Sequence, residues 1–460
     1  MTLIKSISGI RGTIGGTTGD NLTPLDLVKF SSAYAQWLKE NNEGKLTVVV
    51  GRDARISGEM VSSLVSQALV GYGIDVIDLG LSTTPGVEME VTHLNANGGI
   101  ILTASHNPKE WNALKLLNHK GEFLSADEGA LILKYAEEEN FNYSTVDEIG
   151  KVISTPDDGQ YHIEQILALP LVNKEAISKA NFSIAIDAVN STGGIFIPKL
   201  LKALGVNDIH ELYCDPSGEF PHNPEPLPEN LTAIADKIKI VGADLGVVVD
   251  PDVDRLALVC ENGEMFGEEY TLVAVADYIL GHKKGAVVSN LSSSRALRDV
   301  ARNHGVEYFA SAVGEVNVVS KMKEKNAIIG GEGNGGVILP ALHYGRDALA
   351  GIALFLSLLA EKKLSMSKLK STYPTYFISK NKIQLQAGID VDDLLSKFAD
   401  HNSDEEVSTI DGVKVDYKEG WVHLRKSNTE PIIRIYAEAK NEDEASLLAE
   451  KTISLVEKWI

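Results

Sequence analysis

Residues 182–194 read FSIAIDAVNSTGG, and this stretch decides the fold class. An apolar run is followed by a turn of small polar residues and glycine, and a helical pattern comes next. Short apolar runs that alternate with helical patterns are typical of α/β units with parallel strands. The same order recurs at residues 46–53 and 286–294. The spacing of these units, roughly one domain length, predicts related α/β domains.

The length of the chain, 460 residues, requires several domains, because a single hydrophobic core stops growing near ~250 to 300 residues. Domain boundaries are expected near residues 152, 256 and 370. The segment after residue 370 differs from the rest, because strand-like runs at residues 421–425 and 432–437 alternate with helical patterns. This segment is expected to form a smaller α+β domain.

Composition limits the classes of partner. The formal net charge of −21 repels nucleic acid and anionic lipid at long range, and no local basic patch offsets it. The two cysteines, Cys214 and Cys260, lack metal-ligand spacing and predict neither a disulfide framework nor a zinc site. The longest apolar run, residues 348–360, is shorter than the ~20 residues of a membrane span and is expected to form a buried helix. Residues 1–12 contain no apolar segment typical of a signal peptide. We therefore expect a cytoplasmic protein with neither nucleic-acid nor membrane partners.

An acidic loop follows another apolar run, LGVVV at residues 245–249, and its carboxylates are Asp250, Asp252 and Asp254. In an extended loop alternate side chains share one face, so the three can converge on one hard cation, and an oxygen-only site suits Mg²⁺. A solvated acidic turn is the plainer interpretation. The haloacid-dehalogenase phosphatases, whose strand ends in Asp-x-Asp with a nucleophilic first aspartate, are another. No downstream acidic pair supports them, and a calcium loop would need a later glutamate.

A serine follows the apolar run GGIIL at residues 98–102, in the turn TASHNP at residues 103–108. Ser105 and His106 therefore lie beyond a strand, where α/β proteins commonly hold their active sites. A turn or a helix cap is the plainer interpretation of a lone Ser-His pair. Lys115 is expected one or two helical turns further on. It would supply either a desolvated amine with a lowered pKa that acts as a base, or a fixed charge near the serine.

Two further loops are rich in polar side chains that can bind a ligand. Residues 425–431 read RKSNTEP and, with Arg434, gather guanidinium, hydroxyl and amide donors suited to a phosphate, although an ordinary surface loop would look similar. Residues 330–336 read GGEGNGG, a glycine-rich turn whose Glu332 and Asn334 can bond sugar hydroxyls. This turn lacks the Walker lysine, so nucleotide binding is not implied.

These four loops, in this order, resemble the loops of the α-D-phosphohexomutase family. The resemblance spans nearly the whole chain, from SGIRG at residues 8–12 through GEFPHNPEP at residues 218–226 to Arg434. It implies an α/β fold of four domains, three similar α/β domains with mixed sheets and a smaller C-terminal α+β domain, each contributing one loop to a central cleft. The domains would be residues 1–152, 153–256, 257–370 and 371–460.

The resemblance also implies an activity. The family transfers a phosphoryl group between the 6- and 1-positions of a hexose phosphate, through a phosphoserine and a sugar bisphosphate. Ser105 would be the residue phosphorylated in the resting enzyme. Asp250, Asp252 and Asp254 would hold Mg²⁺ together with the phosphate on Ser105.

Basic side chains complete the site that the resemblance implies. Arg11 and Lys115 would neutralise the phosphate and assist proton transfer, with His106 beside them. Glycine-loop side chains would hold ring hydroxyls, and the C-terminal loop would hold the non-reacting phosphate. The residues expected to bind the substrate are Arg255, Glu332, Asn334, Arg425, Ser427, Asn428, Thr429 and Arg434.

Departures from the family pattern bear on the sugar. Glu315 stands where the bifunctional phosphomannomutase/phosphoglucomutase branch tends to have histidine, and an acid there resembles the phosphoglucosamine mutases and their archaeal relatives. A carboxylate can pair with the ammonium of a 2-amino sugar. Asn334 stands where the family often has serine, and Gly336 where many members have histidine, which leaves the sugar contact open. We expect glucosamine phosphate, with a phosphomannomutase/phosphoglucomutase as the alternative.

Two other functions are compatible with some of these residues. A phosphomonoesterase would use Asp250 as its nucleophile. A sugar-phosphate sensor without catalysis would keep the cleft, but it has no need of Ser105, Lys115 and a complete carboxylate triad. The residues favour the mutase, acting as a monomer or a homodimer on a sugar phosphate.

Overall fold

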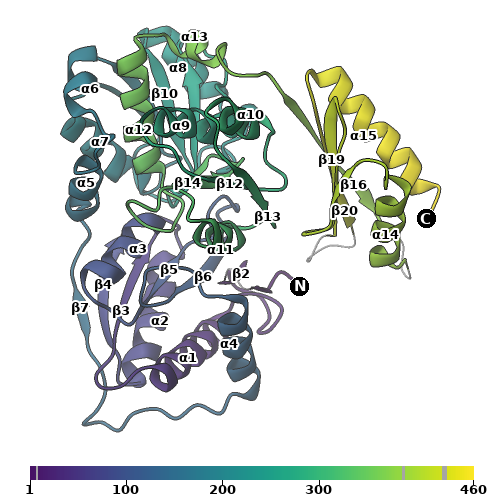
Figure 1. Ribbon diagram of the computed structural model, residues 1–460. Coiled ribbons are helices and arrows are strands. Elements are labelled where there is room, and N and C mark those ends of the chain that lie inside the picture. The colour runs from purple at the N-terminus through teal and green to yellow at the C-terminus, as the bar shows by residue number, and fades with distance from the viewer. Residues whose placement is uncertain (7–8, 386–388, 427–431) are drawn as a thin grey trace. The chain divides into compact units, whose positions relative to one another are not determined.

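The computed structural model describes residues 1–6, 9–385, 389–426 and 432–460. The chain folds into two compact units. The first unit comprises Met1–Thr271 and Gly335–Ser367, and the second comprises Leu272–Asn334 and Lys368–Ile460. Figure 1 labels the helices and strands of both units.

The N-terminal part of the first unit is built around a mixed sheet in the order β1-β2-β6-β5-β3-β4-β7, of which Figure 1 labels the strands β2 to β7. The central strand β5 pairs parallel with β3 and antiparallel with β6. The strands are β1 (Ile4–Ser6), β2 (Gly9–Thr13), β3 (Thr47–Arg52), β4 (Asp75–Leu81), β5 (Gly98–Leu102), β6 (Trp111–Leu117) and β7 (Val152–Ser154). The helices are α1 (Pro24–Asn41), α2 (Gly58–Gly71), α3 (Thr84–His93) and α4 (Ala126–Glu138).

Helices cover both faces of this sheet. Successive side chains of a strand point to opposite faces, so Val48 and Val50 pack in one core with α1, α2 and α4, and Val49 packs in another core with α3. A strand buried on both faces reads as an apolar run, which explains the sequence signal at residues 46–53.

A second mixed sheet in the first unit has the order β11-β10-β8-β9. Strand β10 pairs parallel with β8 and antiparallel with β11. The elements of this part are α5 (Gln160–Leu167), α6 (Lys174–Ala180), β8 (Ser183–Asp187), α7 (Gly193–Leu204), β9 (Asp208–Leu212), η1 (Pro228–Asn230), α8 (Thr232–Val241), β10 (Leu245–Val249) and β11 (Leu256–Cys260). Strand β15 (Gly336–Ile338) and helix α12 (Ala348–Lys362) also belong to the first unit.

The second unit begins within α9 (Glu268–His282) and contains a parallel arrangement in which β12 pairs with β13 and β14. Its elements are β12 (Val287–Asn290), α10 (Ala296–Asn303), β13 (Tyr308–Ser311), α11 (Glu315–Lys325) and β14 (Ile329–Glu332). The three apolar runs singled out in the sequence are β3, β8 and β12, and each has a parallel partner on both sides. The prediction of α/β units with parallel strands is confirmed.

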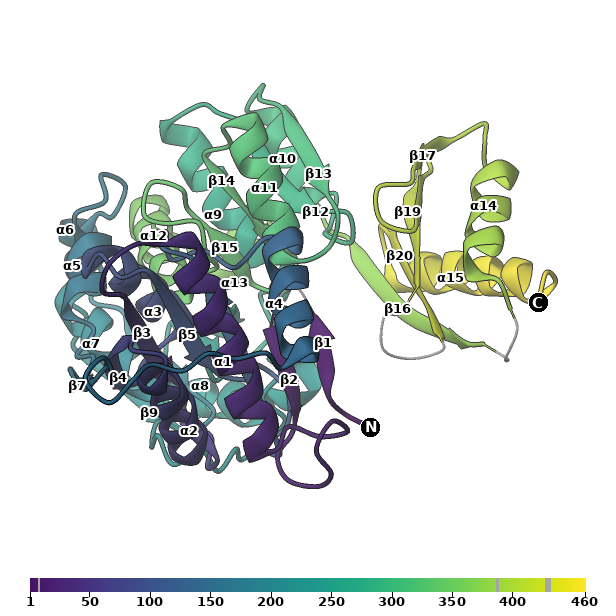
Figure 2. The same ribbon diagram turned by 90° about the horizontal axis from the view of Figure 1, so that it is seen from below.

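The C-terminal segment is different, as expected. After α13 (Met366–Lys370), its strands form an antiparallel sheet in the order β16-β20-β19-β18-β17, and both of its helices pack on one apolar core with the sheet (Figure 2). The elements are β16 (Phe377–Gln384), α14 (Val391–His401), β17 (Glu406–Ser408), β18 (Val413–Asp416), β19 (Gly420–Lys426), β20 (Ile432–Ala439) and α15 (Glu442–Glu457).

The apolar run at residues 348–360 forms most of α12 and is buried, as predicted. In the part of the chain that the structure describes, we find no helix with both the length and the apolar character needed to cross a bilayer.

Candidate active site

Ser105 lies just past the carboxyl end of β5, the central strand of the first sheet. Its hydroxyl donates to Asp250 Oδ2 at 2.6 Å, and its backbone N–H donates to Thr103 Oγ1 at 2.9 Å. Its φ of 49° is in the left-handed region, which residues other than glycine rarely adopt. Such strain, which costs on the order of 1 to 3 kcal/mol, persists only where surrounding contacts enforce it.

Arg55 provides those contacts and is not among the residues predicted from the sequence. Its guanidinium is fully buried and donates to the backbone carbonyls of the serine turn: Nη2 to Ser105 at 2.5 Å and to Asn107 at 2.7 Å, and Nη1 to Pro108 at 2.6 Å and to Trp111 at 2.8 Å. Four donors from one planar group fix the course of the turn.

Asp53 holds Arg55 in place. Its Oδ2 accepts from Arg55 Nε at 3.0 Å and from Thr103 Oγ1 at 2.6 Å. The ring of Phe220 covers the guanidinium, 5.1 Å from ring centroid to Cζ. Asp53 and Arg55 follow β3 at the same sheet edge as Ser105, and this position is the sequence signal that could have identified them.

The acidic loop directly follows β10 and is a turn rather than the extended segment that we expected. The Val253 N–H donates to the Asp250 carbonyl at 3.1 Å, and Val253 has a φ of 63°. The turn nevertheless brings ligand oxygens of Asp250, Asp252 and Asp254 within 4.8 Å of one another. Because Val253 is β-branched, its left-handed backbone is a strained feature at this point.

The chemistry of these carboxylates fits a divalent cation. All three are fully buried. Among the described residues, Oδ1 of Asp252 and Oδ1 of Asp254 have no hydrogen-bond partner. Burial, together with the charges of Asp254 and Asp252, raises the pKa of Asp250 well above its usual range. A hard cation bound by carboxylate oxygens would offset this repulsion and satisfy the unpaired oxygens.

Lys115 lies on β6 and not on the helix that we expected. Its Nζ is 2.7 Å from Asp252 Oδ2 and 3.6 Å from Asp254 Oδ2. Burial lowers the pKa of Lys115, but the two aspartates outweigh burial and raise it above the ordinary value. These contacts favour the other expected role, a fixed positive charge.

Three more predicted residues lie in the same region of the first unit. His106 Nδ1 is 3.4 Å from Ser105 Oγ, and burial and then Arg255 lower the pKa of His106 well below its usual range. Arg11 lies on β2, and burial and then the charge of Arg255 lower its pKa. The Arg255 N–H donates to Asp250 Oδ1 at 3.2 Å. Within the described residues, Arg255 Nε is buried without a hydrogen-bond partner, so it can bond an anion.

Two residues that the sequence analysis did not single out contact the carboxylates. Thr84, the first residue of α3, donates from Oγ1 to Asp252 Oδ2 at 2.6 Å and from its N–H to the Asp252 carbonyl at 2.9 Å. Arg346 Nη2 donates to Asp254 Oδ2 at 2.6 Å. Both approach from segments remote in sequence, so no local pattern marks them.

The predicted sugar-binding residues lie in the second unit. Glu332 ends β14 and is buried, and its Oε1 accepts from Asn290 Nδ2 at 2.8 Å and from the Gly314 N–H at 3.1 Å. Asn334 is partly exposed, two residues further on. Glu315 is buried at the start of α11, directly after Gly314.

The predicted phosphate-binding residues also lie in the second unit. Arg425 on β19 and Arg434 on β20 are cross-strand neighbours. Arg425 Nη2 pairs with Asp411 Oδ2 at 2.9 Å, and Arg434 is exposed. Ser427, Asn428 and Thr429 lie outside the described residues.

Four family models match the chain in order. They are the phosphoglucomutase/phosphomannomutase alpha/beta/alpha domains I, II and III, over residues 3–143, 160–263 and 267–376, and the C-terminal domain, over residues 384–455. The predicted class of four domains, three α/β and one smaller, is thereby confirmed.

Individual proteins agree with this assignment. A phosphoglucomutase/phosphomannomutase of Thermococcus kodakarensis is 36% identical over 453 residues, 97% of this chain and 98% of that protein. A phosphoglucosamine/phosphogalactosamine mutase of Sulfurisphaera tokodaii is 32% identical over 462 residues, 98% of each. The crystal structure of a phosphoglucomutase/phosphomannomutase family protein from Burkholderia thailandensis has a TM-score of 0.82 at 26% identity, covering 99% of this chain and 97% of that one. The chain belongs to the phosphoglucomutase/phosphomannomutase family and is an isomerase of the phosphohexomutase class.

Proposed function

We propose that this enzyme interconverts hexosamine 6-phosphate and 1-phosphate through a phosphate carried on Ser105. The observation that carries the proposal is the contact between Ser105 Oγ and Asp250, 2.6 Å apart, inside a group of three buried carboxylates. A hydroxyl at the end of a central strand, beside a cation site and a lysine ammonium, suits phosphoryl transfer, in which positioning and charge stabilisation supply most of the catalysis.

The reaction is reversible and uses this chain's own groups in two half-reactions. The bond between phosphorus and Ser105 Oγ breaks as a sugar hydroxyl oxygen bonds to the phosphorus. His106, whose Nδ1 is 3.4 Å from Ser105 Oγ, is placed to take the proton of that hydroxyl. The sugar bisphosphate then turns end over end. Its other phosphorus bonds to Ser105 Oγ as the bond to the sugar oxygen breaks, and His106 returns the proton to that oxygen.

The charges around Ser105 have separate roles. Asp250, Asp252 and Asp254, with an oxygen of the phosphate on Ser105, would hold Mg²⁺, which offsets negative charge on the phosphoryl group. The Lys115 ammonium stays charged and holds Asp252 and Asp254 in place.

The second unit supplies the predicted contacts to the rest of the substrate. We assign Glu332 and Asn334 to ring hydroxyls, as the resemblance implies. Residues of the C-terminal loop, Arg425, Ser427, Asn428, Thr429 and Arg434, would bind the non-reacting phosphate. Arg255 of the first unit is the remaining predicted substrate contact.

Two observations support a 2-amino sugar. Glu315 is buried directly after Gly314, whose N–H bonds Glu332, so a second carboxylate begins the helix beside the predicted sugar loop. The Sulfurisphaera tokodaii relative acts, by its name, on glucosamine and galactosamine phosphates. The Thermococcus kodakarensis relative is named for glucose and mannose phosphates. A preference for these sugars is therefore the second candidate for this enzyme.

The contacts of Asp250 favour a cation ligand over the nucleophile of a phosphatase. Asp250 Oδ2 accepts from Ser105 Oγ, and Oδ1 accepts from the N–H groups of Asp254 and Arg255. As a nucleophile, Asp250 would have to direct an oxygen past the Ser105 hydroxyl to the substrate phosphorus.

The experiment that tests the proposal compares kcat/KM for glucosamine, glucose and mannose 1-phosphates, each with its bisphosphate activator. We expect glucosamine 1-phosphate to have the highest value. A large preference for glucose or mannose 1-phosphate would refute the role of Glu315 and leave the mutase chemistry standing.

The Ser105→Ala variant tests the chemistry separately. We expect turnover to be lost for every sugar, while the exposed control Ser217→Ala keeps wild-type activity. Undiminished mutase activity in Ser105→Ala would refute the phosphoserine, and loss of turnover with retained sugar-phosphate hydrolysis would favour a phosphatase.

A further inference from the structure

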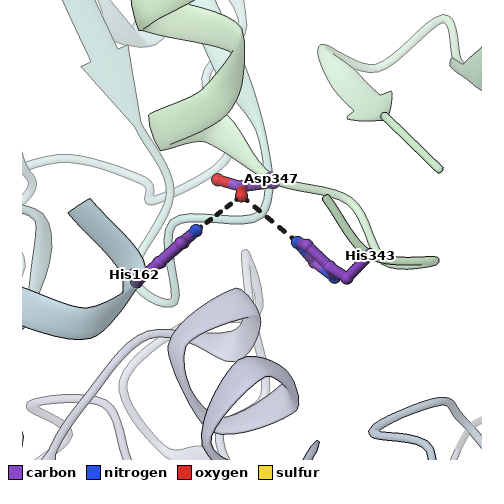
Figure 3. Close-up of side chains that lie close together, drawn as sticks. All are labelled: His162, His343 and Asp347. Atoms are coloured by element: carbon purple, nitrogen blue, oxygen red, sulfur yellow. Dashed lines mark hydrogen bonds and ion pairs between the residues drawn. The ribbon is translucent and has the colours of Figure 1, made fainter. Parts of the chain in front are cut away.

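A second group of metal-ligating side chains lies in the first unit and shares no residue with the three aspartates. His162 projects from α5, Asp347 precedes the first residue of α12, and His343 lies four residues before Asp347 (Figure 3). Their ligand atoms lie within 4.8 Å of one another. The side chains of His162 and Asp347 are 5% and 1% exposed, and that of His343 is 11% exposed.

The two imidazoles converge on one oxygen. Figure 3 shows both rings directed at Asp347. Asp347 Oδ2 is 2.7 Å from His162 Nε2 and 3.2 Å from His343 Nε2. The other oxygen, Oδ1, is occupied because it accepts from the Ala350 N–H at 3.0 Å and caps α12. Both ring nitrogens therefore gather around one carboxylate oxygen, and a separate bond fixes the carboxylate that carries it.

Glu88 lies behind His343. Its Oε2 is 3.1 Å from His343 Nδ1, the ring nitrogen that does not face Asp347. A side chain at Gly345 would overlap Glu88 Oε2, so the segment that carries His343 and Asp347 leaves room for this carboxylate. A carboxylate on the second nitrogen of a ligating histidine orients the ring and makes it a better ligand.

We propose that His162 Nε2, His343 Nε2 and Asp347 Oδ2 bind one Zn²⁺-like transition-metal ion, at a site separate from the three aspartates. Two imidazoles and a carboxylate suit Zn²⁺, whereas three carboxylates suit Mg²⁺. Tetrahedral bonds of about 2.0 to 2.1 Å place ligand atoms about 3.3 Å apart. The distances of 2.7 and 3.2 Å need only a small opening of the group.

The rival explanation is a proton in place of the metal ion. Although burial lowers the pKa of His343, its contacts with Asp347 and Glu88 raise it to about 10. In both explanations a positive charge offsets the negative charge of Asp347 and Glu88. They differ in whether a metal ion or a proton supplies it.

An ion here would stabilise segments that contact the three aspartates. Arg346, next to Asp347, donates to Asp254 Oδ2, and Thr84, one helical turn before Glu88 on α3, donates to Asp252 Oδ2. The proposed ion would tie together α5, the segment before α12 and, through Glu88, α3. The two sites would thus be held by the same elements, α3 and the segment before α12, and would have no ligand in common.

The test measures bound metal in the intact enzyme. Purified protein is stripped with a chelator, equilibrated with Zn²⁺ in a large excess of Mg²⁺, passed through a desalting column and analysed by elemental mass spectrometry. We expect one Zn²⁺ per chain, because imidazole ligands discriminate against Mg²⁺. Co²⁺ in place of Zn²⁺ should give the visible absorption of a four-coordinate ion. If the wild-type enzyme keeps no Zn²⁺ under these conditions, the proton explanation holds and the proposal is wrong.

Variants locate the ion. We expect His162→Gln and His343→Gln to lose the retained Zn²⁺, and Glu88→Gln to weaken it by about 10- to 100-fold. The exposed His119→Gln and the aspartate-site variant Asp250→Asn should keep one Zn²⁺ per chain. Zn²⁺ that is retained by both ligand variants, or lost in Asp250→Asn, would place the ion elsewhere and overturn the assignment.

Discussion

At the scale of single residues, Arg55 shows how a strained nucleophile is held. Its five N–H groups are matched to four carbonyls of the serine turn and to Asp53, and the group is fully buried. A rigid planar fork can satisfy these acceptors together, whereas an ammonium cannot. We infer that Arg55 is a positioning residue that acts on the reaction through the conformation of Ser105.

The Arg55→Lys variant should lower kcat by about 10- to 100-fold, because a displacement of about 1 Å at the reacting atoms can cost a factor of 10². Lysine keeps the charge opposite Asp53 but loses most of the donors to the turn. The measurement is kcat and KM, with Arg302→Lys as the control, since Arg302 is exposed on α10. Wild-type kcat in Arg55→Lys would show that the turn holds its shape without the guanidinium.

The sequence predicted some residues of the site better than others. Ser105 and Asp250 were identifiable because each follows a buried strand, and the ends of such strands gather at one sheet edge. Arg55 was missed although it follows β3 at the same sheet edge, because most of its partners are carbonyl groups, which leave no trace in sequence. The strand that carries Lys115 was not recognised. β6 is buried on both faces, so its sequence lacks the alternation of polar and apolar residues that marks a half-buried strand.

At the scale of elements, helix α3 begins at the aspartate site. Thr84 directs both its hydroxyl and its N–H at Asp252, and the N-terminal end of a helix carries partial positive charge. The hydroxyl and the helix end stabilise the charged carboxylate of Asp252, and the N–H donates to its backbone carbonyl. The start of α3 is therefore expected to tune the affinity of the aspartates for a cation.

Thr84→Val should raise the Mg²⁺ concentration needed for half-maximal activity by about 10-fold, as is usual when an outer partner of a metal ligand is lost. Valine has nearly the shape of threonine and removes the hydroxyl donor. Thr92→Val on the same helix is the matched control, because the Thr92 hydroxyl is exposed and bonds the Met89 carbonyl. Equal Mg²⁺ requirements in the two variants would contradict this prediction.

Strand β19 carries a buried histidine that makes its stability depend on pH. His423 bonds Ser292 Oγ and the Asp411 carbonyl, and burial lowers its pKa to about 4. The folded state therefore resists a proton that the unfolded chain accepts near pH 6.5. This contribution to stability is present above pH 6.5 and is lost as the pH falls toward 4.

Between pH 7 and pH 5 the opening free energy of β19 should fall by about 1 to 2 kcal/mol through His423. Native-state hydrogen exchange of β19 amides, corrected for intrinsic rates, measures this quantity. The fall should be smaller in His423→Gln and unchanged in His119→Gln. An identical fall in His423→Gln would assign the effect to other groups.

At the scale of the whole molecule, the nucleophile, the carboxylates and the basic groups around them are all built within the first unit. They come from β2, β5, β6, β10 and the segment before α12, so the complete fold of that unit is needed to form the site. The fold class could be predicted because parallel strands read as apolar runs. The domain boundaries at residues 152, 256 and 370 stay predictions, as do the roles of Ser427, Asn428 and Thr429.

The most direct test of the central claim is to locate the phosphate that the enzyme carries. The enzyme is incubated with glucose 1,6-bisphosphate labelled in its phosphates, digested and mapped by tandem mass spectrometry. We predict one acid-stable phosphate per chain, on Ser105, and none in Ser105→Ala. A base-labile acyl phosphate on Asp250, or turnover without any phosphate on Ser105, would contradict the account.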